Sequence, residues 1–419
     1  MITTNSTDNT IGMRPFFVLW TFQAVSLLGS QAVQFALIWW LTLETGSATM
    51  LATATLLGLL PQVVLGPLAG ALIDRWNRKS VMIGADALVA LASLVLAGLF
   101  AVGSARFEYV LTLLFLRALG STFHGPAMQA STTLMVPKEH LTRIQGLNQS
   151  LQGGLLIISA PLGGLLLALL TMSSIMLVDV ITALIAIAPL LFVVVPQPKV
   201  SEPAAPDDKK SLFAEIVAGF RYLLERPGHL GIVMMASVTN LFMVPAFALL
   251  PLFVQKDLLG SPMQLGWMMS IFGVGSLAGG ILLGIWGGFQ RRILTTLTSL
   301  VAVGGVVLAL GLTPAGVWWW ALAAMLGLGI LIPLVNGPIQ AVLQATTAAD
   351  FQGRIFTLVG SLAGMTAPLG LILAAPVADL FGVRIWFFAG AVACVSMGLG
   401  ALAVPAITQI EERVAARTT

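Results

Sequence analysis

Long apolar segments, separated by short clusters of charged, polar, Gly and Pro residues, follow one another along the whole chain. A helix that crosses a bilayer needs about 20 mainly apolar residues, and twelve segments come close to or exceed that length. The first six are 16–43, 49–73, 80–103, 108–134, 146–170 and 174–195, and the last six are 230–254, 264–287, 294–312, 316–343, 355–378 and 383–404. The pattern predicts an all-α membrane protein with six helices in each half.

One polar segment separates the two halves. Residues 196–210 are rich in Pro and charged side chains, and residues 211–225 carry apolar side chains at helical spacing, which is typical of a helix that lies on a membrane surface. A plain tether is the alternative. The sequence therefore predicts an N-terminal six-helix bundle (1–195), a cytoplasmic linker with an amphipathic helix (196–229), and a C-terminal six-helix bundle with a short cytoplasmic tail (230–419).

Short motifs of the first half recur in the second half, each about half the chain length further on. The pairs of segments are 66–70 and 275–279, 78–79 and 291–292, and 160–163 and 367–370. Six helices return the chain to the side on which it started, so both copies have the same orientation across the membrane. A parallel repeat of this kind builds transporters in which two halves rock against each other.

Composition and charge support a membrane protein and suggest its orientation. Charged residues make up 9% of the chain and hydrophobic residues 58%, whereas soluble domains carry about 25% charged residues. Of the 20 Lys and Arg residues, 16 fall in segments on one side, and only Arg106, Lys256 and Arg384 fall on the other, with Arg117 inside a helix. The positive-inside rule then predicts a multi-pass protein of a bacterial cell (inner) membrane, with both termini cytoplasmic.

Several kinds of chemistry find no support in the sequence. The single Cys (Cys394) and three His residues form no metal-binding motif, so we expect no metal and no cofactor. No P-loop or hydrolase motif occurs, so we expect a protein that is not an enzyme. A net charge of +3 is too small to indicate nucleic-acid binding. Energy for any pumping must then come from an ion gradient or from a partner subunit.

Polar side chains fall on one face of the first, fourth, seventh and tenth segments. Arg117 lies about 13 Å along its helix from Glu108, which places a cation near the middle of the bilayer. Polar groups at that depth are costly unless they face a wet cavity or one another. We therefore predict a shared substrate-binding cavity; the alternative is a set of polar contacts that join helices. The candidate residues are Gln23, Ser30, Gln34, Arg117, Ser121, His124, Asn240, Asn336 and Gln340.

Two further acids lie within predicted spans, Asp86 in the third and Asp179 in the sixth. An acid that is partly removed from water can take up and release a proton as access alternates between the two sides. Both residues are therefore candidates for proton coupling. An ion pair or a helix cap is the alternative for each.

The segment 70–79, GALIDRWNRK, resembles the signature G-x-L-a-D-r-x-G-r-K of the major facilitator superfamily, in the same turn between helices 2 and 3. Asn77 stands where the family commonly has Gly, and the second copy keeps Arg291 and Arg292 without the acid. The resemblance implies the major facilitator fold, with two pseudo-symmetric six-helix bundles. It also implies a gate that holds the cytoplasmic side shut, formed by Gly70, Asp74, Arg75, Arg78 and Lys79.

Longer stretches are similar to the macrolide-efflux branch of the drug/proton antiporters, among them FQAVSLLGSQAVQFALIWWLTLETGSA and LVPKEHLTRIQGLNQSLQ. One departure is Ala160, which precedes Pro161 where many antiporters have Gly. The resemblance implies a monomeric exporter in the lipid bilayer that moves macrolides or other amphipathic drugs out in exchange for protons, and it leaves room for a separate ATP-binding resistance protein. A bulky drug that carries a protonated amine would suit a pocket with aromatic residues, Met and an acid; Trp20, Trp39 and Met269 are among the candidates.

Two rival interpretations remain at this stage. The first is the same machine exporting a metabolite or a siderophore. The second, from a different class, is a channel or the membrane subunit of an ATP-driven complex. A channel or the membrane subunit of an ATP-driven complex does not require a half-chain repeat with a gate motif. The presence of both features in this sequence therefore favours a transporter.

Overall fold

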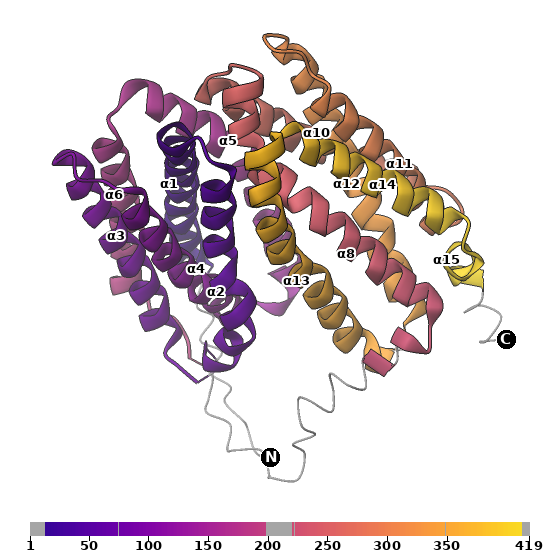
Figure 1. Ribbon diagram of the computed structural model, residues 1–419. Coiled ribbons are helices and arrows are strands. Elements are labelled where there is room, and N and C mark those ends of the chain that lie inside the picture. The colour runs from indigo at the N-terminus through magenta and orange to yellow at the C-terminus, as the bar shows by residue number, and fades with distance from the viewer. Residues whose placement is uncertain (1–12, 74, 198–219, 222, 348, 413–419) are drawn as a thin grey trace, which may run out of the picture.

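The computed structural model describes residues 13–73, 75–197, 220–221, 223–347 and 349–412 (Figure 1). Their regular elements are helices, of which twelve have 19 residues or more. The first half contains α1 (Arg14–Thr45), α2 (Ala48–Ile73), α3 (Arg78–Ala101), α4 (Phe107–Met135), α5 (Leu141–Leu169) and α6 (Met172–Phe192). The second half contains α8 (Pro227–Ala248), α10 (Pro262–Trp286), α11 (Arg292–Gly311), α12 (Trp318–Thr346), α13 (Ala349–Phe381) and α14 (Arg384–Leu402). Each predicted segment overlaps one of these helices, which confirms the all-α prediction.

Eleven of the twelve long helices are long and apolar enough to cross a membrane, judged on the described residues. The twelfth is α4, which carries Glu108, Arg117 and His124 along its length. Arg117 and His124 lie on the face that the sequence marks as a candidate site, and Glu108 lies in the first turn of the helix. A helix of this kind needs polar partners inside the bundle rather than lipid around it.

Local sequence signals determine where several helices begin and end. Asn77 caps α3, since its side-chain oxygen accepts a hydrogen bond from the Ser80 backbone N–H at 3.2 Å. Ser261 and Gln264 form a reciprocal capping box at the start of α10. Gly46 ends α1 in the left-handed region with φ of +55°, where a side chain would be strained. Asn77, the departure from the family signature, therefore has a helix-capping role.

The helices form two six-helix bundles (Figure 1). We call the end at which α1 and α8 begin and α6 and α14 end the linker end, and the opposite end the far end. Within the first bundle α3 packs against α4 and α6, and α1 packs against α5 and α6; within the second, α11 packs against α12 and α14, and α8 against α13. The predicted amphipathic helix over 211–225 falls largely outside the described residues.

The two bundles meet through two equivalent helix pairs, α2 with α13 and α5 with α10. The sequence repeat relates α2 to α10 and α5 to α13, so each contact is the counterpart of the other. Close packing within the bundles also repeats: a Cβ atom at Gly163 would lie 2.7 Å from the Ala32 carbonyl oxygen of α1, and one at Gly370 would clash with the Leu241 carbonyl oxygen of α8. Both glycines belong to the repeated A-P-L-G motif, whose packing role is thereby explained.

Buried apolar residues show that the two bundles are joined mainly toward the far end. The largest cluster includes Trp39 and Leu41 of the first half together with Phe253 and Leu265 of the second. A separate cluster at the linker end contains residues of the first half only: Phe16, Leu19, Ala69, Ile73, Met82, Ala127, Met135, Val136, Ile144, Leu190 and Val195. In Figure 1 the two groups of helices diverge toward the linker end.

We predict that Gly370→Ala lowers the free energy of unfolding by about 1–3 kcal/mol, because the new methyl group is forced against the backbone of α8. Gly364→Ala, on the same helix, is the matched control, since a Cβ atom there meets nothing within 4 Å. The measurement is the thermal unfolding midpoint of each purified variant in detergent. Equal midpoints for the two variants would contradict the close approach at Gly370.

Candidate functional site

A buried ion pair lies at the centre of the first bundle. Asp179 of α6 is fully buried and is ion-paired with Arg117 of α4, which is 6% exposed. The Asp179 carboxylate also accepts hydrogen bonds from the Ser30 hydroxyl at 2.7 Å and the Ser93 hydroxyl at 2.5 Å. Arg117 donates to the Ser93 hydroxyl oxygen at 2.5 Å and to the Ser30 carbonyl oxygen at 3.3 Å. Four helices, α1, α3, α4 and α6, thus converge on two opposite charges.

The environment of this pair determines its role. Charges removed from water are costly, and only a close opposite charge with further hydrogen bonds offsets that cost. Both Asp179 oxygens accept hydrogen bonds, and Arg117 donates through both terminal nitrogens, whereas its Nε has no partner among the described residues. The geometry therefore favours the ion-pair alternative for Asp179 over a group that exchanges protons.

Asp86 of α3 lies in a different setting. One carboxylate oxygen, Oδ2, accepts a hydrogen bond from Gln23 Nε2 at 3.0 Å, and the other, Oδ1, lies 3.5 Å from His124 Nε2. Within the described part of the chain, His124 Nε2 has no hydrogen-bond partner. Asp86 is 8% exposed, and its neighbours Gln23 and His124 both reach a cavity. This acid has an incompletely bonded oxygen and an ionisable neighbour at the cavity wall.

The cavity beside Asp86 has a volume of about 300 Å³, and we call it the amide pocket. Its described lining comes from α1, α4 and α5, without a residue of the second bundle. Five side-chain amides contribute to it, together with Trp20 and Met128. The full lining is Trp20, Gln23, Ala24, Leu27, His124, Gly125, Met128, Gln129, Thr132, Gln145, Asn148, Leu151 and Gln152.

A second cavity, of about 330 Å³, lies between the two bundles, and we call it the apex cavity. Gln31 and Gln34 of α1 are its polar members on that helix, and Phe247 and Met269 are among its apolar members from the second half. Residues of α1, α2 and α5 thus meet residues of α8, α9 (Leu250–Leu252) and α10 there. Of the aromatic and Met candidates, Trp20 and Met269 line a cavity, whereas Trp39 is 3% exposed within the core.

The remaining polar candidates do not join these cavities. Ser121 is exposed on α4 and donates to the Arg117 carbonyl oxygen at 3.1 Å. Asn240 donates to the Ala363 carbonyl oxygen at 3.3 Å and so joins α8 to α13. Asn336 and Gln340 are exposed on α12 and line neither cavity. The structure therefore brings together the polar faces of the first and fourth helices, but not those of the seventh and tenth.

Arg78 and Lys79 of the signature segment 70–79 make hydrogen bonds to residues of the first bundle. Arg78 donates to the Ala130 carbonyl oxygen of α4 at 2.7 Å. Lys79 Nζ donates to the carbonyl oxygens of Leu191 and Val193, at the end of α6, at 3.0 and 3.2 Å. Gly70 and Arg75 are exposed, and Asp74 lies outside the described residues. In this conformation the basic residues tie α3 to α4 and α6, and the predicted gate remains a prediction.

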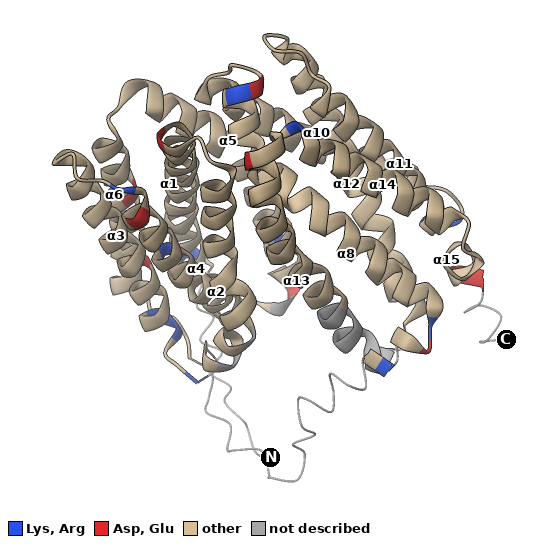
Figure 2. Ribbon diagram, in the orientation of Figure 1, with Lys and Arg blue, Asp and Glu red and all other residues tan. Residues whose placement is uncertain are grey.

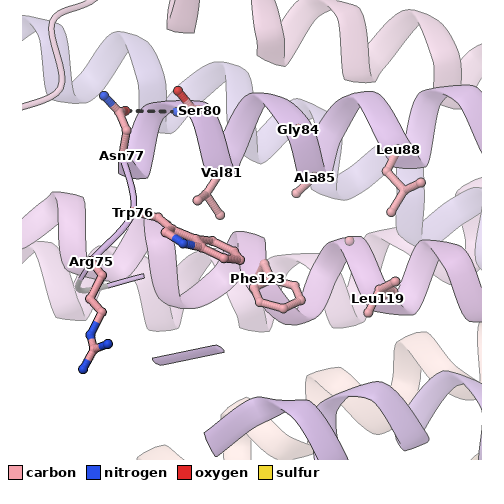
Figure 3. A pocket seen from close by; sticks show the side chains of 11 residues that line it. Arg75, Trp76, Asn77, Ser80, Val81, Gly84, Ala85, Leu88, Leu119 and Phe123 are labelled. Atoms are coloured by element: carbon pink, nitrogen blue, oxygen red, sulfur yellow. Dashed lines mark hydrogen bonds between the residues drawn. The ribbon is translucent and has the colours of Figure 1, made fainter. Parts of the chain in front are cut away.

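A third cavity, of about 700 Å³, is a groove between α3 and α4 (Figure 3). At its linker end the rings of Trp76 and Phe123 stack with centroids 6.2 Å apart, and Figure 3 shows Arg75 pointing away from them. Val81, Ala85, Leu88 and Leu119 continue the lining, which is mainly apolar. The groove thus lies apart from the interface between the bundles.

A cluster of polar contacts, which we call the clasp, joins the two bundles at the far end. The Asp379 carboxylate of α13 accepts hydrogen bonds from the backbone N–H groups of Ala48 at 2.7 Å and Thr49 at 3.1 Å. The hydroxyl groups of Ser47 and Thr49 donate to the same carboxylate at 3.1 and 2.6 Å. A carboxylate from one half therefore caps the first turn of α2 in the other half. Lys256 adds a bond from the second half to the Gly46 carbonyl oxygen at 2.5 Å.

Several functional residues were missed from the sequence although signals for some were present. Ser93 lies seven residues after Asp86 and thus on the same face of α3. Gln145, Asn148 and Gln152 are spaced by three and four on α5, as one face requires. Asp379 had no such signal, because the clasp depends on how the two halves meet. Figure 2 shows charged residues mainly toward helix ends, with some partway along helices of the first half.

Comparisons with known proteins agree with this architecture. The family model of the Major Facilitator Superfamily matches residues 19–258. Macrolide efflux protein A of Streptococcus pyogenes is 35% identical over 372 residues, covering 89% of this chain and 91% of the relative. Macrolide efflux protein A of Enterococcus faecalis is 33% identical, covering 78% and 100%. Multidrug efflux pump Tap of Mycolicibacterium fortuitum is 28% identical, covering 89% and 91%.

Two solved structures show the same fold. A bacterial homologue of the iron transporter ferroportin, in an inward-facing state, has a TM-score of 0.73 at 14% identity and covers 96% of this chain and 99% of its own. A bacterial homologue of the lysosomal transporter Spinster, inward-facing and unoccupied, has a TM-score of 0.69 at 13% identity, with 98% of both chains covered. At this level of identity the likeness concerns the fold.

We predict that Arg117→Met lowers the free energy of unfolding by about 3–5 kcal/mol, because Asp179 is left as a buried, uncompensated charge. Adding Asp179→Leu should restore most of the lost stability, since the double variant buries no charge. Arg143→Met, at an exposed position of α5, is the control. The measurement is thermal unfolding in detergent. A double variant as unstable as Arg117→Met would show that the unpaired charge is not the cause.

We also predict that Asp379→Asn opens the far end. Because Asp379 is exposed, solvent screens its charge, and we expect a loss of about 1 kcal/mol, or roughly a fivefold shift in a balanced population. Distances between spin labels at the far ends of α2 and α13 report the change. Asp257→Asn, which removes an ion pair with Arg384 inside the second half, is the control. Unchanged distances in Asp379→Asn would rule out the clasp as a closure.

Proposed function

The chain belongs to the Major Facilitator Superfamily and to its macrolide-efflux branch, and we propose that it exports macrolide-type or other amphipathic drugs by alternating access, in exchange for protons. It is a transporter and not an enzyme. The relatives that carry the names macrolide efflux protein and multidrug efflux pump support this class of substrate. Proton exchange and alternating access are the finer parts of the proposal, and features of this chain's own structure support them.

The observation that carries the proposal is the apex cavity, which residues of both bundles line just inside the far-end closure. The clasp closes the far side of this cavity, and the buried core at the linker end belongs to the first bundle alone. These features support a carrier that is open toward the linker end. If the bundles rock about the contacts of α2 with α13 and of α5 with α10, the linker end would close and the far end would open.

Orientation follows from charge. Arg106 precedes α4, Lys256 lies between α9 and α10, and Arg384 begins α14, so all three lie at the far end. The linker end receives most of the other basic residues. We therefore assign the linker end, and with it both termini, to the cytoplasm of a bacterial cell. The open cavity then faces the compartment from which a drug must be removed.

Proton coupling is best assigned to Asp86 rather than to Asp179. Asp179 is fully buried and bonded to Arg117, Ser30 and Ser93, whereas Asp86 Oδ1 lies beside an imidazole that reaches the amide pocket. A proton can reach His124 and Asp86 from the cavity without breaking the ion pair of Arg117. Arg117 then serves to fix α4 against α3, and so to hold His124 near Asp86.

Alternatives outside this proposal predict different behaviour. A metabolite or siderophore exporter would show the same coupling but another substrate range. A channel would conduct without coupling, and the membrane subunit of an ATP-driven complex would need a separate ATP-binding resistance protein. We take the monomer as the transport unit, because both halves of the cavity come from one chain.

The proposed orientation predicts that a cysteine at Ser261, at the far end of α10, reacts with an impermeant thiol reagent added to intact cells. A cysteine at Ser201, within the predicted cytoplasmic linker, should react only after the membrane is opened. Cys394 is buried and gives little background. Labelling of position 201 from outside, with position 261 protected, would reverse the orientation.

Transport itself is tested with purified protein in liposomes. A pH gradient alone, without ATP, should drive accumulation of a macrolide against its concentration gradient, and a protonophore should abolish it. Asp86→Asn should lose this uphill accumulation, while Glu108→Gln, at the far end of α4, should keep it. Accumulation that needs ATP and a second protein, or drug flux that ignores the pH gradient, would overturn the proposal.

A further inference from the structure

We propose that the amide pocket is a subsite for a protonated amino sugar carried by the drug, and that the pair of Asp86 and His124 exchanges this cation for a proton. This inference rests on the proposed function and refines it, by naming the part of the substrate that binds and the residues that recognise it. Neither the pocket nor this pair is a feature that the family signature marks.

The lining of the pocket has the chemistry that a polyhydroxylated group requires. A side-chain amide offers both donors and an acceptor, so neighbouring amides can bond hydroxyl groups in either direction. Gln129, Gln145 and Gln152 stand on two facing helices, α4 and α5, and Gln23 adds an amide from α1. A pocket for an apolar macrocycle alone would not need so many amides, and Gln129, Gln145 and Gln152 are exposed, so their amide groups are accessible to a ligand.

Trp20 adds a surface for a cation. Its indole N–H donates to the Asn148 side-chain oxygen at 2.7 Å, which fixes the ring at the wall of the pocket. A fixed Trp face attracts an ammonium group through its quadrupole. Asn148 thus has a positioning role, since it orients the ring.

The charge balance around the pocket favours a single cation. With His124 neutral, the pair of Asp86 and His124 carries one negative charge. Arg117 is compensated by Asp179 from α6, and α2 has no ionisable side chain in its sequence. The other ionisable groups on these elements stand near helix ends: Arg14 and Glu44 of α1, Arg78 and Lys79 of α3, Glu108 of α4, and Arg143 of α5. One drug cation therefore neutralises the site.

Proton exchange follows from the same geometry. Gln23 occupies Asp86 Oδ2, so Oδ1, 3.5 Å from His124 Nε2, is the oxygen left for a new bond. When hydronium transfers its proton to the imidazole, an O–H bond breaks, an N–H bond forms and water is left. The pair then has no net charge and no longer attracts the ammonium group, which can leave. Drug cation and proton thus compete for one negative site.

The size and position of the pocket fit part of a large drug. Its volume of about 300 Å³ stands at the small end of ligand pockets, about 300–1,000 Å³. The apex cavity follows it along α1, because Leu27 of the amide pocket and Gln31 of the apex cavity are one helical turn apart. The mainly apolar residues Ile38, Leu59, Phe247 and Met269 of the apex cavity suit the macrocycle, and the amide pocket suits its sugar.

The test is equilibrium binding to the purified full-length protein in detergent, which needs no transport. Two probes are compared: a macrolide that carries a dimethylamino sugar, and the same macrolide after removal of that sugar. In wild type, binding of the amine-bearing probe should weaken as the pH falls and should release a proton into weakly buffered solution. Binding of the sugar-free probe should be nearly independent of pH.

Three variants separate the roles of the residues. Asp86→Asn should lower the affinity for the amine-bearing probe by about tenfold or more and abolish proton release. It should have little effect on the affinity for the sugar-free probe. His124→Gln keeps a polar group but has no basic ring nitrogen to accept a proton, so it should flatten the pH profile. Gln152→Leu should lower the affinity for the amine-bearing probe by about fivefold and leave the affinity for the sugar-free probe unchanged. Gln62→Leu, at an exposed position of α2 outside both cavities, is the matched control.

Equal binding of the two probes by wild type, or equal weakening of both probes by Asp86→Asn and Gln152→Leu, would overturn the subsite. Proton release that persists in Asp86→Asn would overturn the exchange. These failures are distinct from failure of the proposed function: liposomes could still accumulate macrolide on a pH gradient if the sugar binds elsewhere. Conversely, selective binding without gradient-driven accumulation would leave the subsite intact and refute proton-driven export.

Discussion

The ion pair between Arg117 and Asp179 constrains the rest of the first bundle. Two charges can remain in the interior of a membrane protein when each meets the other and further hydrogen bonds offset the cost of removing them from water. Here that condition draws α1, α3, α4 and α6 together through the hydroxyl groups of Ser30 and Ser93. With α4 fixed in this way, His124 lies two turns further along, beside Asp86 and at the wall of the amide pocket. The ion pair of Arg117 and Asp179 thus helps to position His124 beside Asp86.

The second bundle has no comparable ion pair among the described residues within its spans, and its packing depends instead on small residues. Gly370 packs against α8, and Gly275 and Gly279 pack against α12. Close backbone contact of this kind lets each bundle move as a rigid unit. In the proposed transport cycle the interface between the bundles is the place where motion would occur, and the Asp379 carboxylate of its clasp is exposed. A stiff interior with a weaker, screened closure is the arrangement that alternating access needs.

The twelve helices could be predicted from the sequence because a helix that crosses a bilayer needs a minimum number of consecutive apolar residues. Each such segment can be recognised by itself, without knowledge of its neighbours in the fold. The sequence also predicted that Arg117 and His124 face the interior, since helical spacing alone decides which face is polar. It could not predict partners. That Arg117 meets Asp179, while Asp86 meets Gln23 and His124, depends on how helices far apart in sequence are arranged. Asn240, Asn336 and Gln340 line neither the amide pocket nor the apex cavity for the same reason: their faces are polar, but the conformation determines what each one meets.

The central claim is that one cavity between the bundles is open to only one side at a time, and its most direct measurement uses a single cysteine at Gln34, in the apex cavity, on a Cys394→Ala background. An impermeant thiol reagent is applied to inside-out vesicles and, separately, to intact cells. We expect fast modification from the cytoplasmic side in resting protein, and modification from outside only while drug and a pH gradient drive turnover. Fast modification of resting protein from both sides would contradict alternating access and indicate a channel.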